Sequence, residues 1–276
     1  MTIIASLLRA ADLPDSPTAR LDAELLLAAA LGKSRSFLHT WPERIVPSEA
    51  ALKFAGYLQR RRGGEPVAYI LGQQGFWKLD LQVAPPTLIP RPDTELLVEA
   101  ALELLPVAPA RVLDLGTGSG AIALALASER PAWQLTAVDR VQEAVALAER
   151  NRQRLHLHNA TVLSSHWFSA LQGQRFELII SNPPYIASAD PHLAEGDVRF
   201  EPASALVAGI DGLDDLRLIV DQAPNHLDAG GWLMLEHGYD QALAVRDLLM
   251  TRGFEEVHSR TDLGGHERIS LGRLPC

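Results

Sequence analysis

The chain has 276 residues, of which 47% are hydrophobic, and its formal net charge is −9. This length allows one large domain or two ordinary ones, and the acidic balance argues against a protein that tracks bare duplex phosphates. No run of about 18 uninterrupted apolar residues and no basic-then-apolar leader pattern is present, and the one cysteine, Cys276, excludes an intrachain disulfide or thiolate metal site. The nine histidines lack metal-ligand spacing. We therefore expect a globular, cytoplasmic protein without a metal.

Residues 1–64 are predicted to form a small bundle of helices that are rich in alanine and leucine. Ser16-Pro17 offers an N-cap and a first-turn proline for a helix that Gly32 ends. A last helix is expected to open at Pro47-Ser48-Glu49 and to run to Arg62, where Gly63-Gly64 stops it.

Residues 65–92 have a different character. Apolar and polar residues alternate from Trp77 to Val83, which predicts a strand, and we expect this strand to pair with Val67 to Leu71 in a β-hairpin. The proline-rich segment from Pro85 to Pro92 is typical of a stiff connector. Asp93 or Thr94 can then cap a helix that runs through Leu105.

From residue 111 onward, predicted strands and helices alternate. The strands are 111–115, 134–139, 160–164, 176–181, 231–236, 254–259 and 267–272, and the helices are 120–130, 141–154, 214–227 and 239–252. This order indicates an α/β fold with a Rossmann-like, mostly parallel sheet and helices on both faces. Only about seven residues join the last two strands, too few for a helical crossover, so an antiparallel C-terminal strand is expected.

A glycine-rich loop follows the first of these strands. Glycines at Gly116, Gly118 and Gly120, interleaved with Thr117 and Ser119, allow a tight turn and expose amides at a helix N-terminus. The spacing G-x-G-x-G differs from the G-x-G-x-x-G of nicotinamide-dependent enzymes.

An acid follows the glycine loop at the spacing of a nucleoside site. Asp139 ends the next strand about twenty residues further on, where nucleoside-binding sheets bond ribose hydroxyls. Trp167 follows the 160–164 strand and falls at the same edge. Together with the glycine loop, Asp139 predicts a site for an adenosine-type ligand.

The tetrad Asn182-Pro183-Pro184-Tyr185 comes directly after the strand 176–181. Two consecutive prolines produce a stiff, extended turn. The Asn182 side chain and the Pro183 carbonyl can accept hydrogen bonds from a planar –NH₂ group, and the Tyr185 ring can cover its face. The alternative is an ordinary proline-rich exit from a strand.

These motifs together resemble the class I S-adenosylmethionine-dependent methyltransferases. Within that class the chain is similar to the HemK/PrmC family of peptide chain release factor glutamine N5-methyltransferases. The motifs that carry the resemblance are Ile89–Glu95, Asp114–Gly120, Asn182–Tyr185, and Glu201-Pro202 with Ala205-Leu206 and Asp211-Gly212-Leu213. The N-P-P-Y tetrad alone is shared with DNA adenine methyltransferases, but the combination is far more selective.

The resemblance implies methyl transfer from S-adenosyl-L-methionine to N5 of the glutamine in the GGQ motif of class-one release factors. It implies three regions: a substrate-docking helical domain (1–64), a hairpin and proline-rich linker (65–92), and a methyltransferase domain (93–276). The release factor is the expected partner, with no membrane and no sequence-specific nucleic acid.

The resemblance also assigns roles to residues. The implied cofactor-binding residues are Gly116, Thr117, Gly118, Ser119, Gly120, Asp139, Trp167 and Asn182. The implied substrate-binding residues are Asn182, Pro183, Pro184 and Tyr185, of which Asn182, Pro183 and Tyr185 are also implied as catalytic. Arg91 to Glu95 and Glu201-Pro202 are expected to wall the pocket.

Two other functions stay open from the residues alone. An adenine-N6 DNA methyltransferase would present a similar planar amino group, although no basic target-reading region is visible. A regulatory module could bind the cofactor without catalysis, although the intact Asn182 and Tyr185 argue against it.

Overall fold

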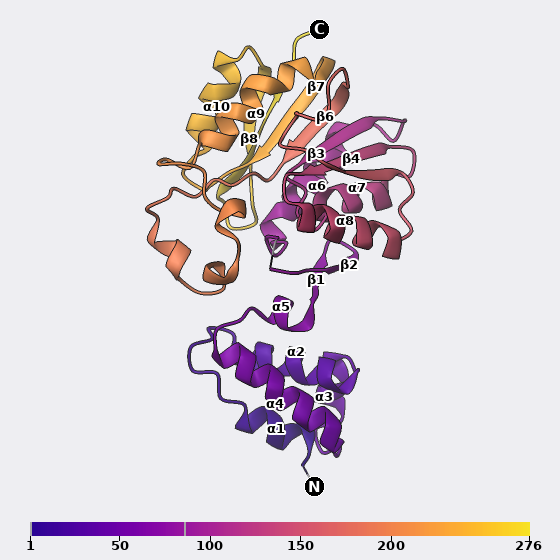
Figure 1. Cartoon of the computed structure of the whole chain (residues 1–276), viewed down its shortest axis with the longest axis vertical. Coiled ribbons are helices and arrows are strands. Elements are labelled where there is room, and N and C mark those ends of the chain that lie inside the picture. Colours follow the sequence, from indigo (N-terminus) through magenta and orange to yellow (C-terminus); the bar gives the residue numbers. More distant parts are fainter. Residues whose placement is uncertain (1, 86) are drawn as a thin grey trace. The chain divides into compact units, whose positions relative to one another are not determined.

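The computed structural model describes residues 2–85 and 87–276, and it divides the chain into two compact units. One unit comprises Met1–Gln73 together with His192–Phe200, and the other comprises Gln74–Pro191 together with Glu201–Cys276 (Figure 1). This division does not coincide with the predicted boundary at residue 64. Pro86, in the predicted proline-rich connector, lies outside the described residues.

The first unit contains the predicted helical bundle. Its helices are α1 (Ile4–Ala10), α2 (Ala19–Leu31), α3 (Arg35–Thr40), α4 (Ser48–Arg62) and α5 (Val67–Leu71). Leu26 and Leu27 of α2 are fully buried and pack in one apolar core with Leu38 and Phe54. Gly32 ends α2 in the left-handed conformation with a φ of 61°, as expected of a helix C-cap glycine.

The predicted cap of α2 is wrong by two residues. Thr18, not Ser16, occupies the N-cap position. The Ser16 and Thr18 hydroxyls instead donate hydrogen bonds to the two carboxylate oxygens of Asp22, at 2.7 and 2.9 Å. Because Asp22 lies in the first turn, its side chain competes successfully for the hydroxyls that would otherwise cap the helix.

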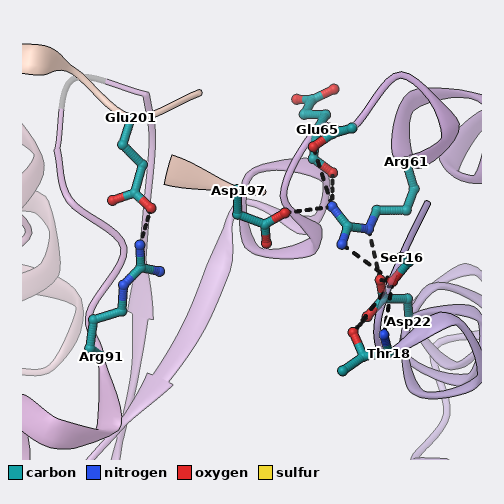
Figure 2. A network of polar contacts seen from close by, with 9 residues as sticks. Ser16, Thr18, Asp22, Arg61, Glu65, Arg91, Asp197 and Glu201 are labelled. Atoms are coloured by element: carbon teal, nitrogen blue, oxygen red, sulfur yellow. Dashed lines mark hydrogen bonds and ion pairs between the residues drawn. The ribbon is translucent and has the colours of Figure 1, made fainter. Parts of the chain in front are cut away.

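The segment His192–Phe200 is anchored in this unit by a buried ion pair. The Arg61 guanidinium donates to Asp22 of α2 and to Asp197 of the segment, both at 2.7 Å, and only 7% of its side chain is exposed. Figure 2 shows Arg61 between these two carboxylates. Segments far apart in the sequence are thus joined by one cation.

The prediction that Val67–Leu71 forms a hairpin strand is wrong. These residues form the short helix α5, which Pro66 precedes and Gly72 ends with a φ of 69°. The hairpin lies further on, between β1 (Gln73–Phe76) and β2 (Leu79–Gln82). Three consecutive buried residues, 68–70, do not alternate as a strand requires, and a two-residue connection selects the nearer partner.

The hairpin belongs to the core of the second unit. Phe76 and Leu81 are buried in the same apolar cluster as Leu97 of α6 (Glu95–Leu104). The Asn151 side chain of α8 (Gln142–Arg154) pairs with the Gln82 backbone, accepting from its N–H at 2.8 Å and donating to its carbonyl at 2.9 Å. The hairpin is therefore a packed part of this unit.

The second unit is built on a seven-stranded sheet within the described residues. Its strands are β3 (Arg111–Leu115), β4 (Gln134–Asp139), β5 (Ala160–Ser164), β6 (Phe176–Ser181), β7 (Leu227–Glu236), β8 (Glu255–Thr261) and β9 (Glu267–Arg273). Their order is β5-β4-β3-β6-β7-β9-β8, and β9 is antiparallel to both of its neighbours while the pairs from β5 to β7 are parallel. The predicted fold class is confirmed.

Helices cover both faces of this sheet. They are α6 (Glu95–Leu104), α7 (Ala121–Glu129), α8 (Gln142–Arg154), α9 (Asp214–Gln222) and α10 (Ala242–Thr251). Figure 1 shows α6, α7 and α8 on one face and α9 and α10 on the other, in keeping with two separate apolar clusters. The predicted helix 214–227 is too long, because Leu227 already begins β7.

The sheet topology reverses at β3. The chain runs from β3 outward through β4 to β5, and then returns to the other side of β3 with β6. In open α/β sheets such a switch point opens a crevice at the carboxyl ends of the strands. The glycine loop and Asn182 follow strands that end at this crevice, and Asp139 is the last residue of β4 at the same edge.

Candidate active site

A cavity lies at this carboxyl edge. Its lining includes most of the residues predicted from the sequence: Gly116, Thr117, Gly118, Ser119, Asp139, Trp167, Asn182 and Pro184. Thr87, Pro90 and Thr94 line it as well. Gly120, Pro183 and Tyr185 do not line the cavity, so the structure brings together eight of the eleven predicted residues.

The glycine loop has the backbone that its sequence predicts. Gly116, Gly118 and Gly120 have φ values of 71°, 56° and 88°, a region that other residues avoid. A Cβ on Gly116 would lie 3.3 Å from the Trp167 ring, and one on Gly120 would lie 2.8 Å from a Leu124 methyl carbon. Gly116 thus keeps the cavity wall open, whereas Gly120 permits the packing of α7 behind it.

Asp114 stabilises the glycine loop through hydrogen bonds. Its buried carboxylate accepts hydrogen bonds from the Thr117 hydroxyl at 2.6 Å and from the Ala123 N–H at 3.2 Å. Complete burial raises the pKa of Asp114 to about 7, against the lowering effect of these two donors. No role is predicted for Asp114 from the sequence, although an acid among the apolar residues of a strand is a usable signal.

Asp139 is held rigidly at the cavity wall. One carboxylate oxygen accepts from the Gly118 N–H and the other from the Val141 N–H, both at 2.9 Å. A carboxylate oxygen has a second lone pair, so both atoms can still accept from a ligand's hydroxyl groups.

Trp167 forms an apolar wall of the same cavity. The residue adopts a φ of 50°, which is uncommon outside glycine, and is 7% exposed. The Ser165 hydroxyl donates to the Trp167 carbonyl at 2.7 Å and stabilises this conformation. Such strain at a cavity is typical of functional positions.

Thr94 fixes the side-chain amide of Asn182. The Asn182 Nδ2–H group donates to the Thr94 hydroxyl oxygen at 3.1 Å, and Thr94 is buried. The predicted helix-capping bond of Thr94 is absent among the described residues, since its hydroxyl serves Asn182 instead. This arrangement leaves Asn182 Oδ1 as a hydrogen-bond acceptor at the cavity.

Residues at the end of β7, in the segment after it and before α9 contact Tyr185 of the tetrad. The Tyr185 hydroxyl donates to Glu236 at 3.4 Å, and the Gln241 side-chain amide donates to the Tyr185 carbonyl at 2.9 Å. A Cβ on Gly212 would lie 2.2 Å from that carbonyl oxygen, so only glycine fits there. Burial, followed by the nearby Glu236 charge, raises the pKa of Tyr185. Sequence reasoning missed Glu236 and Gln241.

Comparisons with known proteins show which proteins this chain resembles. The family model described as PrmC N-terminal domain matches residues 3–72, and that described as Methyltransferase small domain matches residues 92–203. The release factor glutamine methyltransferase of Pseudomonas aeruginosa is 71% identical over 276 residues, with both chains fully covered. The chain belongs to the release factor glutamine methyltransferase family.

A further relative and a solved structure are similar to this chain. The release factor glutamine methyltransferase of Escherichia coli is 52% identical over 258 residues, which are 94% of this chain and 93% of that one. Among solved structures, a methyltransferase from Pyrococcus furiosus has a TM-score of 0.57 at 17% identity, covering 80% of this chain and all of that one. This likeness concerns the fold, which is that of a class I methyltransferase.

Two residues that the family resemblance placed at the pocket wall pair with each other in this methyltransferase. Arg91 donates to the buried Glu201 carboxylate, as Figure 2 shows, and the other Glu201 oxygen accepts from the Ile89 N–H at 3.2 Å. Neither Arg91 nor Glu201 lines the cavity itself. The pair instead ties together the two segments that supply Pro90 and Ser204 to its lining.

Within residues 2–85 and 87–276, no group of three His, Cys, Asp or Glu side chains could hold a metal ion. No helix in the same ranges is long and apolar enough to cross a membrane.

Proposed function

We propose that this chain transfers the methyl group of S-adenosyl-L-methionine to the N5 amide nitrogen of the glutamine in the GGQ motif of class-one release factors. Membership of the release factor glutamine methyltransferase family supports this proposal. The single observation that carries it is the Thr94–Asn182 hydrogen bond, which presents Oδ1 as an acceptor at the cavity. The activity belongs in the cytoplasm, with the release factor as protein partner.

The cavity has the chemistry that the cofactor requires. The two fixed oxygens of Asp139 suit the paired hydroxyls of a ribose, and the Trp167 wall suits the adenine ring. Gly116 and Gly118 line the cavity with backbone rather than side chains, which suits the methionine part. When bound, the cofactor supplies a methyl group that is already activated by its sulfonium.

The methyl acceptor needs help, because an amide lone pair is delocalised into its carbonyl. Asn182 Oδ1 and the Pro183 carbonyl would accept hydrogen bonds from the two amide hydrogens and orient the nitrogen. The same acceptors would stabilise positive charge as it develops there, which is electrostatic catalysis by preorganised groups. Tyr185 would cover one face of the amide. No strong general base is required, since the alkylated nitrogen becomes acidic and loses its proton late.

A methyl-transfer assay with labelled cofactor tests this proposal. The purified chain is incubated with an intact release factor, with the same factor carrying alanine for the GGQ glutamine, and with duplex DNA containing adenine. We expect label only in the unchanged release factor. Label in DNA, or equal label in the alanine variant, would contradict the assigned substrate.

A further inference from the structure

Glu236 is a buried carboxyl group directly behind the tetrad, and the chemistry described above does not use it. It is the last residue of β7, whose Leu235 pairs with Ser181 of β6, so Glu236 and Asn182 lie at the ends of adjacent strands, at the same edge of the sheet. Only 3% of the residue is exposed. An ionisable group buried this deeply needs a physical reason.

Glu236 is connected to both polar residues of the tetrad, directly to Tyr185 and through Thr94 to Asn182. Its Oε1 atom accepts from the Tyr185 hydroxyl at 3.4 Å. The Thr94 hydroxyl faces the same carboxyl and lowers its pKa, although only the Tyr185 contact has full hydrogen-bond geometry. Oε2 has no hydrogen-bond partner among the described residues. Thr94 in turn accepts from Asn182.

The protonation of Glu236 is finely balanced. Burial raises its pKa to about 7, and Asp93 raises it further, whereas Thr94, Tyr185 and Arg268 of β9 lower it. The carboxyl group therefore changes charge near neutral pH.

The neighbouring His237 does not compete for this proton. Burial lowers its pKa, and its Nδ1–H donates to the Gly238 carbonyl at 2.9 Å. Its Nε2 accepts from the Ser270 hydroxyl at 2.8 Å. His237 is therefore a neutral ring whose two nitrogens are both engaged.

We propose that Glu236, as a carboxylate, is a positioning residue for methyl transfer, because it makes the Thr94 and Tyr185 hydroxyls donors and so orients the Asn182 amide. An ionised carboxylate can only accept hydrogen bonds. The Thr94 hydroxyl then directs its proton to Glu236, and its oxygen is left to accept from Asn182 Nδ2. Oδ1 stays available to the methyl acceptor; this role rests on the proposed function.

Without the negative charge on Glu236, the direction of the hydrogen bonds made by the Thr94 hydroxyl is no longer determined. A protonated Glu236, or a glutamine there, can donate to the Thr94 oxygen, and the Thr94 proton is then free to turn toward Asn182. The Asn182 amide can rotate to accept that proton with Oδ1. Its Nδ2 would then face the –NH₂ group of the incoming glutamine amide. Because both groups are hydrogen-bond donors, Asn182 would no longer hold the methyl acceptor in place.

The test compares the wild type with Glu236→Gln and Glu236→Asp, and takes Glu255→Gln, an exposed position on β8, as the matched control. Turnover on a release factor and cofactor affinity are measured from pH 5.5 to 8.5. We expect Glu236→Gln to lower kcat by about 10–100-fold with little change in cofactor Kd. Wild-type kcat should fall below pH 7, and this acid limb should be absent from Glu236→Gln. Glu236→Asp should recover part of the rate, and Glu255→Gln should match the wild type.

A second readout does not depend on activity. In ¹⁵N-labelled protein, the Asn182 side-chain amide resonance should shift near pH 7 in the wild type and stay constant in Glu236→Gln. Wild-type kcat in Glu236→Gln, or an Asn182 resonance that titrates identically in both proteins, would overturn the role of Glu236. An inactive wild type whose Asn182 resonance titrates as expected would instead refute the proposed substrate. If Glu236→Gln fails to fold, Glu236→Asp and the wild-type titration carry the test.

Discussion

At the scale of single residues, the orientation of the Asn182 side-chain amide decides whether this residue can accept a hydrogen bond from the substrate. The bond from Nδ2 to Thr94 assigns the two ends of this amide different roles. Asn182→Ala removes the Oδ1 acceptor while the buried prolines keep the backbone in place. We expect turnover to fall by about 10²–10³-fold, because the lost contact strengthens as charge develops on nitrogen. Single-turnover kinetics beside calorimetry should show cofactor affinity nearly unchanged, and a parallel loss of affinity would contradict this role.

Tyr185 offers a graded comparison at the same place. Tyr185→Phe keeps the ring and loses only the long hydroxyl contact to Glu236. It should retain much of the activity, whereas Tyr185→Ala should lose most of it, as measured by kcat on a release factor. Equal loss in both variants would show that the hydroxyl, and not the ring, is what the reaction requires.

Asp114 should leave a signature in the pH dependence of stability. Its folded pKa of about 7 lies above the ordinary value of 3.8, so folding favours the protonated form. The contribution of Asp114 protonation to the free energy of unfolding is complete below the unfolded pKa and is lost as the pH rises through 7. The side chain introduced by Asp114→Asn cannot titrate. Between pH 5 and pH 8 the free energy of unfolding of this variant should therefore rise by on the order of 1–3 kcal/mol relative to that of the wild type. Urea unfolding measures this difference, and a pH-independent difference would contradict the raised pKa.

At the scale of elements, the Arg61 ion pair holds a loop to the helical unit. Arg61 is the one cation that bonds both Asp22 of α2 and Asp197 of the segment His192–Phe200 within the described residues. Arg61→Ala leaves the buried Asp22 carboxylate without its countercharge, so we expect a loss of about 3–5 kcal/mol. Asp197→Asn should cost much less, because that side chain is 41% exposed. Hydrogen exchange should show segment 192–200 opening in both variants, and unchanged protection would mean that other contacts hold it.

At the scale of the whole molecule, the chain passes between the two units at residues 73–74, 191–192 and 200–201. Segment 192–200 leaves the second unit a few residues after the tetrad and returns at Glu201, which pairs with Arg91. A short stretch of chain thus connects this segment of the first unit to the tetrad. The apolar cores themselves are separate, since the helical cluster contains only residues before Gln73.

A fragment that begins at Gln74 should therefore fold and bind the cofactor, but lose activity on an intact release factor. A fragment that begins at residue 85 should be much less stable, because it lacks the buried Phe76 and Leu81 and the Gln82–Asn151 pair. Thermal unfolding and calorimetry compare the two fragments. Full activity of the Gln74 fragment on the intact factor would show that the helical unit does not serve in docking.

The sequence by itself determined the alternation of strands and helices, the antiparallel C-terminal strand and the cavity residues Gly116, Asp139 and Asn182. These features depend on local signals: apolar periodicity, glycines that permit positive φ, and acids and amides placed at strand ends. Tertiary structure alone decided that Thr94 serves Asn182 rather than a helix, that Glu236 lies behind Tyr185, and that Arg61 pairs with Asp197. These contacts join residues 51 to 136 positions apart in the chain, as Tyr185 with Glu236 and Arg61 with Asp197 show. No local pattern encodes such pairs, because they form only when packing brings distant segments together.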